Sequence, residues 1–264
     1  MDVRVLGTVQ DGGVPHLGCA CDLCEGARTD PGRQRYASSL LLAGESTRYL
    51  IDATPDVRFQ LRGDLLDGVF LTHEHLGHLS GLLYFGPESL AAAQLTVHCT
   101  PQLAAFVGAN EPFAGLSEQD YIELDPVRPG SGVDLAGTVV RPRRVPHRST
   151  HADTVAYRIS ADRSLLYVSD IDAWTDETIR MVADADVALV DGTFWRSGEL
   201  DRYDEVPHPA IVDSMDALDP TGTEIHFTHL NHTNPVLQPG SEERQRVEDR
   251  GFHVADRADT FTLG

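Results

Sequence analysis

The sequence contains no lysine: all 21 basic residues are arginine, against 41 aspartates and glutamates, which leaves a formal charge of −20. Such an acidic surface repels phosphate backbones and therefore argues against general nucleic-acid binding. It is typical of a protein that stays hydrated in a salty cytoplasm, where counter-ions screen the repulsion. The charge is spread along the whole chain, so it does not indicate a separate acidic tail.

Long apolar runs and targeting segments are also missing. No stretch approaches the ~18 apolar residues that span a bilayer, and the opening residues, MDVRVLGTVQ, do not resemble a signal peptide. We therefore expect a cytoplasmic protein with no membrane partner. Its 264 residues, 41% of them hydrophobic and undivided by any linker, predict one domain over 1–264.

Only four cysteines are present, and three of them, Cys19, Cys21 and Cys24, lie within six residues in GCACDLC. Cysteines this close do not easily pair with one another, so in a cytosolic protein the cluster indicates metal ligands rather than disulfides. Tetrahedral zinc needs a fourth ligand, for which Cys99 is one candidate. The sequence thus predicts a zinc-binding loop over about residues 10–26.

Short apolar runs predict strands, and amphipathic stretches between them predict helices. The predicted strands are 3–7, 39–44, 48–53, 68–72, 95–99, 154–159, 164–170, 187–191 and 224–229, and the predicted helices are 78–86, 101–108, 174–184, 208–218 and 241–250. Two groups of strands, each followed by helices, predict an α/β fold in which two sheets pack face to face between outer helices. Polar residues gather where the strands end, as α/β active sites do: Asp52, His73, His147, Asp170, Asp191 and His229.

Three histidines crowd one of these strand ends, in THEHLGH. His73 and His75 point the same way from an extended backbone, and His78 lies one helical turn further on, so the three imidazoles can surround one point. We therefore predict a metal site. Isolated histidines are more often hydrogen-bonded surface or core residues, which is our interpretation of His16, His98, His226 and His253.

The sequence resembles the metallo-β-lactamase superfamily, whose signature is His-x-His-x-Asp-His followed by a distant His, Asp and His on a four-layer αββα sandwich. YLIDATPD resembles the strand before the signature, THEHLGH the signature and LLYVSD the later aspartate, over nearly the whole chain. LGTVQDGGVPHLGCACDLC, DGTFW and HLNHTNP resemble the branch of coenzyme PQQ synthesis protein B and the cyclic phosphodiesterase of the carbon–phosphorus lyase pathway.

This resemblance implies two neighbouring metal sites at the strand ends. The first would be made by His73, His75 and His147. The second would be made by His78 and His229, and Asp170 would bridge the two. The same branch closes its cysteine cluster with a histidine three residues after the last active-site histidine, which implies His232 as the fourth ligand of a structural zinc.

One departure from the signature affects the second site, because its aspartate falls on Gly77, which cannot bind a metal. We therefore expect a mononuclear or loosely filled centre, with His78 and His229 free for other contacts. Asp172 is a candidate replacement for the missing carboxylate. Replacing Gly77 with aspartate is then expected to raise metal occupancy.

The leading hypothesis is a metallo-hydrolase of a small phosphoester or carbonyl-type substrate, with one or two zinc ions. Neutral imidazole ligands let the metal lower the pKa of bound water toward ~7, so that metal-bound hydroxide attacks the substrate. Asp170 would orient that water, and either the metal or His78 would polarise the scissile group. His208, which begins a predicted helix, would protonate the leaving group. Asp52 and Asp191 would orient neighbouring ligands.

Two other hypotheses stay open. Histidines and a carboxylate also hold non-haem iron for oxygen chemistry, and coenzyme PQQ synthesis protein B resembles such an oxygenase; iron or manganese would then take the place of zinc. Alternatively, the chain is a metal-stabilised binding module with a decayed active site. The sequence does not decide the substrate or whether a homodimer forms, and 110–120 and 195–207 are candidate substrate-contacting segments.

Overall fold

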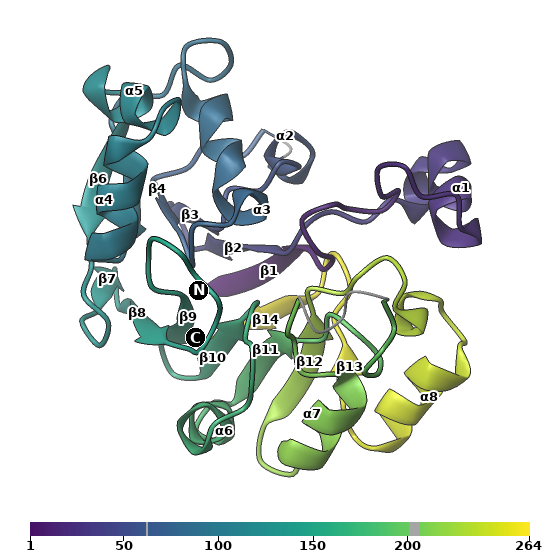
Figure 1. Ribbon diagram of the computed structural model, residues 1–264. Helices are drawn as coiled ribbons and strands as arrows, with labels where there is room; N and C mark the ends of the chain where they lie inside the picture. Colours follow the sequence, from purple (N-terminus) through teal and green to yellow (C-terminus); the bar gives the residue numbers. More distant parts are fainter. Residues whose placement is uncertain (62, 201–205) are drawn as a thin grey trace.

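The structure is a computed structural model that describes residues 1–61, 63–200 and 206–264. These residues form two seven-stranded sheets (Figure 1). The first has the order β14 (Thr260–Thr262), β1 (Asp2–Gly7), β2 (Ser39–Ala43), β3 (Arg48–Ile51), β4 (Gly68–Phe70), β5 (Leu95–Cys99), β6 (Ile122–Pro126). The second has the order β13 (His253–Val254), β12 (Glu224–Thr228), β11 (Val187–Asp191), β10 (Ser164–Val168), β9 (Val155–Ser160), β8 (Thr138–Arg144), β7 (Val133–Leu135).

Both sheets are mixed: β3 to β6 and β10 to β13 pair in parallel, and the neighbouring strands β1 to β3 and β7 to β10 pair antiparallel. Helices α2 (Val57–Gln60), α3 (Leu76–Leu79), α4 (Pro101–Ala109) and α5 (Phe113–Glu118) lie beside the first sheet. Helices α6 (Asp176–Ala183), α7 (Ile211–Ala217) and α8 (Glu242–Asp249) lie beside the second, and α1 (Asp22–Thr29) stands apart from both (Figure 1). No described helix is long and apolar enough to cross a membrane.

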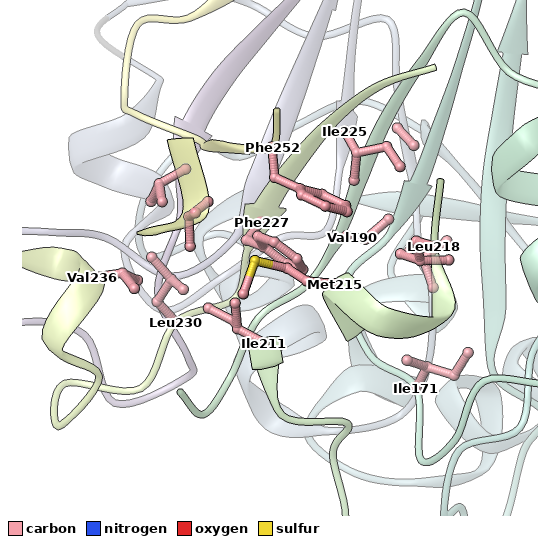
Figure 2. Close-up of a cluster of buried hydrophobic side chains, with 14 of the residues drawn as sticks. Ile171, Val190, Ile211, Met215, Leu218, Ile225, Phe227, Leu230, Val236 and Phe252 are labelled. Atoms are coloured by element: carbon pink, nitrogen blue, oxygen red, sulfur yellow. The ribbon is translucent and has the colours of Figure 1, made fainter. Parts of the chain in front are cut away.

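The buried side chains form three hydrophobic clusters. Successive residues of a strand point to opposite faces of its sheet and so join different clusters. On β11, Val187 and Leu189 join the cluster between the sheets, whereas Ala188 and Val190 join the cluster under the outer helices. Figure 2 shows that second cluster, with Phe227 of β12 packed beside Met215 of α7. A third cluster lies under α4 and α5. Because strand residues alternate between the two faces, each sheet supplies two layers of core, and the predicted αββα sandwich is confirmed.

The predicted elements differ from the observed ones in identifiable places. The helix predicted over 78–86 is a short α3 followed by a 3-10 helix, η2 (Ser80–Phe85). Strands β6, β7, β8, β13 and β14 and helices α1, α2 and α5 were missed. The short strands carry too few residues to show a period, and β8 contains Pro142, which lacks the N–H that a ladder uses and so argued against a strand.

Candidate metal centre

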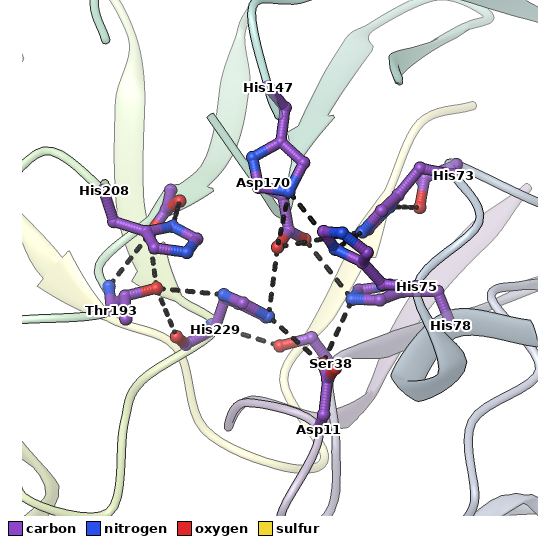
Figure 3. Close-up of polar contacts among 12 residues, drawn as sticks. Asp11, Ser38, His73, His75, His78, His147, Asp170, Thr193, His208 and His229 are labelled. Carbon is purple, nitrogen blue, oxygen red and sulfur yellow. Dashed lines mark hydrogen bonds and ion pairs between the residues drawn. The ribbon is translucent and has the colours of Figure 1, made fainter. Parts of the chain in front are cut away.

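Three imidazoles converge at the carboxyl-end edge of the sheets. Nε2 of His73 lies 3.0 Å from Nδ1 of His75, and Nε2 of His147 lies 3.4 Å from the same atom (Figure 3). Burial lowers the pKa of His73 well below its usual range, lowers the pKa of His147 to about 4 and also lowers the pKa of His75. The three rings are therefore neutral at pH 7 and turn their ligand atoms to one point, as predicted for the first metal site.

Two of these rings, those of His73 and His147, are oriented by partners outside the centre. Nδ1 of His73 lies 2.9 Å from the hydroxyl of Thr72, and Nδ1 of His147 lies 2.9 Å from Oδ1 of Asp172. Asp172 also accepts a hydrogen bond from Arg148 at 3.2 Å. The carboxylate of Asp172 thus supports the first site, and the structure does not favour it as the candidate replacement for the missing carboxylate of the second site.

Asp170 lies at the centre of the cluster, directly after β10, and its side chain is 4% exposed. Its Oδ1 is 3.9–4.0 Å from Nε2 of His147 and His73 and 3.4 Å from Nε2 of His229, while its Oδ2 is 3.4 Å from Nε2 of His78. Burial would raise the pKa of Asp170, but the surrounding imidazoles outweigh it and hold the pKa well below the usual range. The carboxylate is therefore ionised and reaches both sides of the centre (Figure 3).

His78 and His229 form the other side. Asp52 accepts from Nδ1 of His78 at 2.8 Å, as expected for a residue that fixes a histidine tautomer, and the hydroxyl of Thr193 lies 3.0 Å from Nδ1 of His229. The Nε2 atoms of both rings are buried without a hydrogen-bond partner in the described part of the chain. Burial alone would lower the pKa of His78, but nearby carboxylates, Asp170 first, raise it well above its usual range.

Asp11 completes this side, and sequence reasoning missed it. Its Oδ1 lies 3.5 Å from Nε2 of His78 and 3.8 Å from Nε2 of His229. The only signal in the sequence was its place in the Asp-Gly-Gly turn of the predicted zinc-binding loop. A Cβ at Gly77 would lie 2.6 Å from Cβ of Asp11 and would overlap its carboxylate. The structure therefore argues against the expectation that a Gly77→Asp change alone raises metal occupancy, because the new side chain would first have to displace Asp11.

His208 also reaches the centre, although it precedes α7 by three residues rather than beginning it. Its Nδ1 lies 2.6 Å from Oδ2 of Asp191, and its Nε2 lies 3.3 Å from a guanidinium nitrogen of Arg148. Because that guanidinium only donates, Nδ1 carries the imidazole proton toward Asp191 and Nε2 accepts. The ligand atoms of His208, Asp170 and His229 lie within 4.8 Å of one another.

The predicted structural cluster also comes together. The thiols of Cys19, Cys21 and Cys24 and a ring nitrogen of His232 lie within 4.8 Å of one another. Sγ of Cys24 lies 3.9 Å from Nδ1 of His232. Cys99 ends β5 in the core beside the first sheet, where burial raises its pKa to about 12. The structure thus favours His232 over Cys99 as the fourth ligand.

The family model for the beta-lactamase superfamily domain matches residues 47–233. The chain belongs to the metallo-β-lactamase superfamily. Coenzyme PQQ synthesis protein B of Methylorubrum extorquens strain PA1 is 30% identical, covering 100% of both chains. The crystal structure of Zn²⁺-bound PqqB from Methylobacterium extorquens is 27% identical with a TM-score of 0.86, covering 100% of both chains. A diphosphatase of the PhnP family is 22% identical with a TM-score of 0.75, covering 98% of this chain and 96% of that one, and shows the fold alone.

Proposed function

We propose that this chain is a metal-dependent hydrolase of a small anionic substrate, with a phosphoester as the first candidate. The observation that carries the proposal is the convergence of His73, His75 and His147 beside the ionised carboxylate of Asp170. The superfamily fold is one of enzymes, which supports an enzymatic role. Retention of the whole histidine set argues against a binding module with a decayed active site.

The donor atoms fit zinc. Imidazole nitrogens with a carboxylate are ligands that zinc takes, and the Zn²⁺-bound relative supports the same metal. Nε2 of His78, Nε2 of His229 and Oδ2 of Asp170 are buried without hydrogen bonds in the described residues, an arrangement that costs free energy unless something binds them. When bound, zinc lowers the pKa of a coordinated water toward ~7 and polarises the scissile group.

A cleft of about 650 Å³ lies beside the centre, which is the size of a small-molecule site. Asp11, Arg148 and Phe194 line it, together with Leu200 and Val206 from the predicted substrate segment 195–207. Residues 201–205 of that segment lie outside the described residues. The guanidinium of Arg148 is a cation in the cleft wall of a chain whose net charge is −20. A cation there favours an anionic group on the substrate, and we propose no nucleic-acid or membrane partner.

His208 is placed to serve the leaving group. Asp191 accepts a hydrogen bond from Nδ1–H of His208 and thereby fixes the ring. Nε2 of His208 lies next to the guanidinium of Arg148, which lines the cleft. To act, Nε2 of His208 would release the Arg148 guanidinium, take up a proton from solvent, and donate it to the departing oxygen while water adds to phosphorus. A general acid of this kind contributes about 10²–10⁴-fold to the rate.

The test compares leaving groups in a His208→Gln variant. We expect kcat to fall by about 10²–10⁴-fold for alkyl phosphodiesters, which need a proton on the leaving oxygen. The loss should be much smaller for 4-nitrophenyl phosphodiesters, whose leaving group departs without one. Metal content should be unchanged. His226→Gln, on β12 and paired with Glu224, is the control and should change neither rate.

Two results would overturn this assignment. An equal loss for both leaving groups together with lost metal would make His208 a ligand. No hydrolysis of any ester by the zinc-loaded wild type would remove the hydrolase proposal itself.

The oxygenase is the second candidate, and the full-length similarity to coenzyme PQQ synthesis protein B favours it. Hydrolysis needs only water, so turnover should be the same with and without oxygen. The zinc-loaded and iron-loaded proteins should both be assayed in sealed vessels with an oxygen electrode. Substrate-dependent oxygen uptake by the iron-loaded protein, with no ester hydrolysed, would decide for the oxygenase.

A further inference from the structure

We propose that Asp11 supplies the second-site carboxylate that Gly77 cannot, so that Asp11, His78 and His229 would hold a second metal ion beside the one that His73, His75 and His147 would hold. The proposal rests on the proposed function in one respect, because both require a metal centre. It adds a ligand from a different part of the chain, 66 positions before the one where the superfamily signature carries its aspartate.

The geometry of the second group supports this role. The ligand atoms of Asp11, His78 and His229 lie within 4.8 Å of one another, as those of His73, His75 and His147 do. The Nε2 atoms of His78 and His229 are buried and lack a hydrogen-bond partner within the described ranges, and both face the Asp11 carboxylate at 3.5 and 3.8 Å. These separations are longer than good hydrogen bonds, and the three side chains point toward one another (Figure 3), as the ligands of one cation would.

Gly77 and Asp11 exclude each other's side chains. The Asp11 carboxylate fills the space that any side chain at residue 77 would enter, since a Cβ there would lie 2.6 Å from Cβ of Asp11. The glycine is therefore what allows Asp11 to approach His78. One carboxylate has been exchanged for another, and the second site keeps its hard oxygen ligand.

The backbone around Asp11 is held on both sides. Before it, Leu230 donates to the carbonyl of Thr8 at 2.9 Å, and Gln10 donates back to the carbonyl of Leu230 at 3.1 Å. After it, Gly13 donates to the carbonyl of Gln10 at 2.9 Å and closes the turn, with a φ of +63°. Asp11 is therefore a fixed residue beside His229, although half of its side chain remains exposed.

The experiment measures metal content, not turnover. Wild-type protein and variants are equilibrated with buffered free zinc, and bound metal is counted by elemental analysis. In parallel, zinc is replaced with cobalt and the visible absorption spectrum is recorded. Cobalt bound by nitrogen and oxygen ligands at the centre absorbs differently from cobalt bound by thiolates at the cysteine cluster, so the two kinds of site can be counted separately. The wild type should bind three ions, one at the cysteine cluster and two at the centre. Asp11→Asn should bind two, with an affinity loss at the third of at least about 100-fold, more than an outer-shell residue costs.

The decisive variant moves the carboxylate back. Gly77→Asp alone should not gain metal, because the two side chains overlap. Combined with Asp11→Gly, it should restore the third ion. The matched control is Asp125→Asn: Asp125 is also 49% exposed and also pairs with a histidine, His98, but lies outside the centre. It should leave all three ions bound.

The outcomes separate the two proposals. If Asp11→Asn still binds three ions with unchanged affinity, Asp11 is not a ligand, whatever the protein hydrolyses. The same holds if the wild type binds only two ions and the variant matches it. If Asp11→Asn loses one ion and the double variant regains it, the ligand stands even if no ester is hydrolysed.

Discussion

Several side chains that do not themselves face the metal centre hold the imidazoles that do face it in their orientation. Asp52 is the clearest case: it is fully buried, its Oδ1 accepts from the backbone N–H of Thr72 at 2.8 Å, and its Oδ2 accepts from Nδ1 of His78. Its own backbone has a φ of +64°, in the left-handed region. His229 has a φ of +57°. Such strain persists where the surrounding structure fixes the residue, and it collects at functional sites.

We predict that Asp52→Asn lowers metal affinity on the His78 side by about 10–100-fold, the usual cost of losing an outer-shell partner. Asparagine tolerates a positive φ, so the backbone should keep its conformation. Competition with a fluorescent zinc chelator measures the affinity, and a thermal melt checks folding. A folded variant with unchanged affinity at every site would show that Asp52 does not orient His78.

At the residue scale, the candidate ligands that lie close together in the sequence could be predicted, whereas Asp11, which lies far from the other candidate ligands of the centre in the sequence, could not. Three histidines in six residues and three cysteines in six are too rare to be accidental. The cysteines come together as predicted, whereas the histidines divide between neighbouring groups, His73 and His75 in one and His78 in the next. Asp11 gave no such signal, because an aspartate before two glycines is typical of an ordinary turn. Its meeting with His78 depends on pairing between the segments around Val9 and Leu230, which no local pattern predicts.

At the scale of elements, the segment from residue 8 to residue 24 joins two sites. It begins at the bridge between Val9 and Leu230, carries Asp11 in its turn, and ends at Cys24 beside His232. The ring of His16 stacks on that of His232 at 4.3 Å. Zinc in the cysteine cluster would therefore fix the far end of the segment that presents Asp11.

Cys21→Ser tests this link. We predict the loss of one zinc per chain, a lower melting temperature and faster proteolysis within residues 8–24, because structural zinc binding is coupled to folding. We also predict weaker metal binding on the His78 side, with the three-histidine side unchanged. Cys99→Ala, in the buried end of β5, is the control and should lose no zinc. Full zinc content in Cys21→Ser would contradict the structural cluster.

Among the elements, those with strong periodicity or end signals could be predicted. Thr175 caps α6, which the sequence placed within two residues of its observed start at Asp176. The break between α3 and η2 could not be predicted, because it comes from tertiary contact. The N–H of Gly81 donates to the carbonyl of Ala53 at 2.8 Å, and the two backbones approach too closely for a Cβ at residue 81.

At the scale of the whole molecule, the fold could be predicted from short continuous apolar runs, because both sheets are covered on both faces. Strands such as β11 are buried throughout and differ only in which cluster each residue joins. The strand order could not be read in this way. β14 pairs with β1 although they are separated by more than 250 residues, a contact fixed by the closing of the first sheet.

The net charge predicts a response to salt. With a formal charge of −20, self-repulsion opposes the compact state, and raising salt from about 0.01 M to about 1 M shortens the screening length from ~30 Å to ~3 Å. The melting temperature of the zinc-loaded protein should therefore rise, by about 2–4 °C for each kcal/mol of repulsion relieved. NaCl and KCl should act alike in differential scanning fluorimetry. A flat or falling melting temperature would contradict the prediction, and a response to one salt alone would indicate specific ion binding.

The short segment from His229 to His232 has a consequence for synthesis. It supplies His229 to the metal centre and His232 to the cysteine cluster. Neither group of ligands is therefore complete until this segment has left the ribosome. Cys24 and His232 are 208 positions apart, which at ~5–20 residues per second is about 10–40 s of translation. Throughout that interval the three thiols would lack their fourth partner and would be open to oxidation and to competing metals. We therefore expect the supply of zinc during translation to affect the yield of correctly metallated protein.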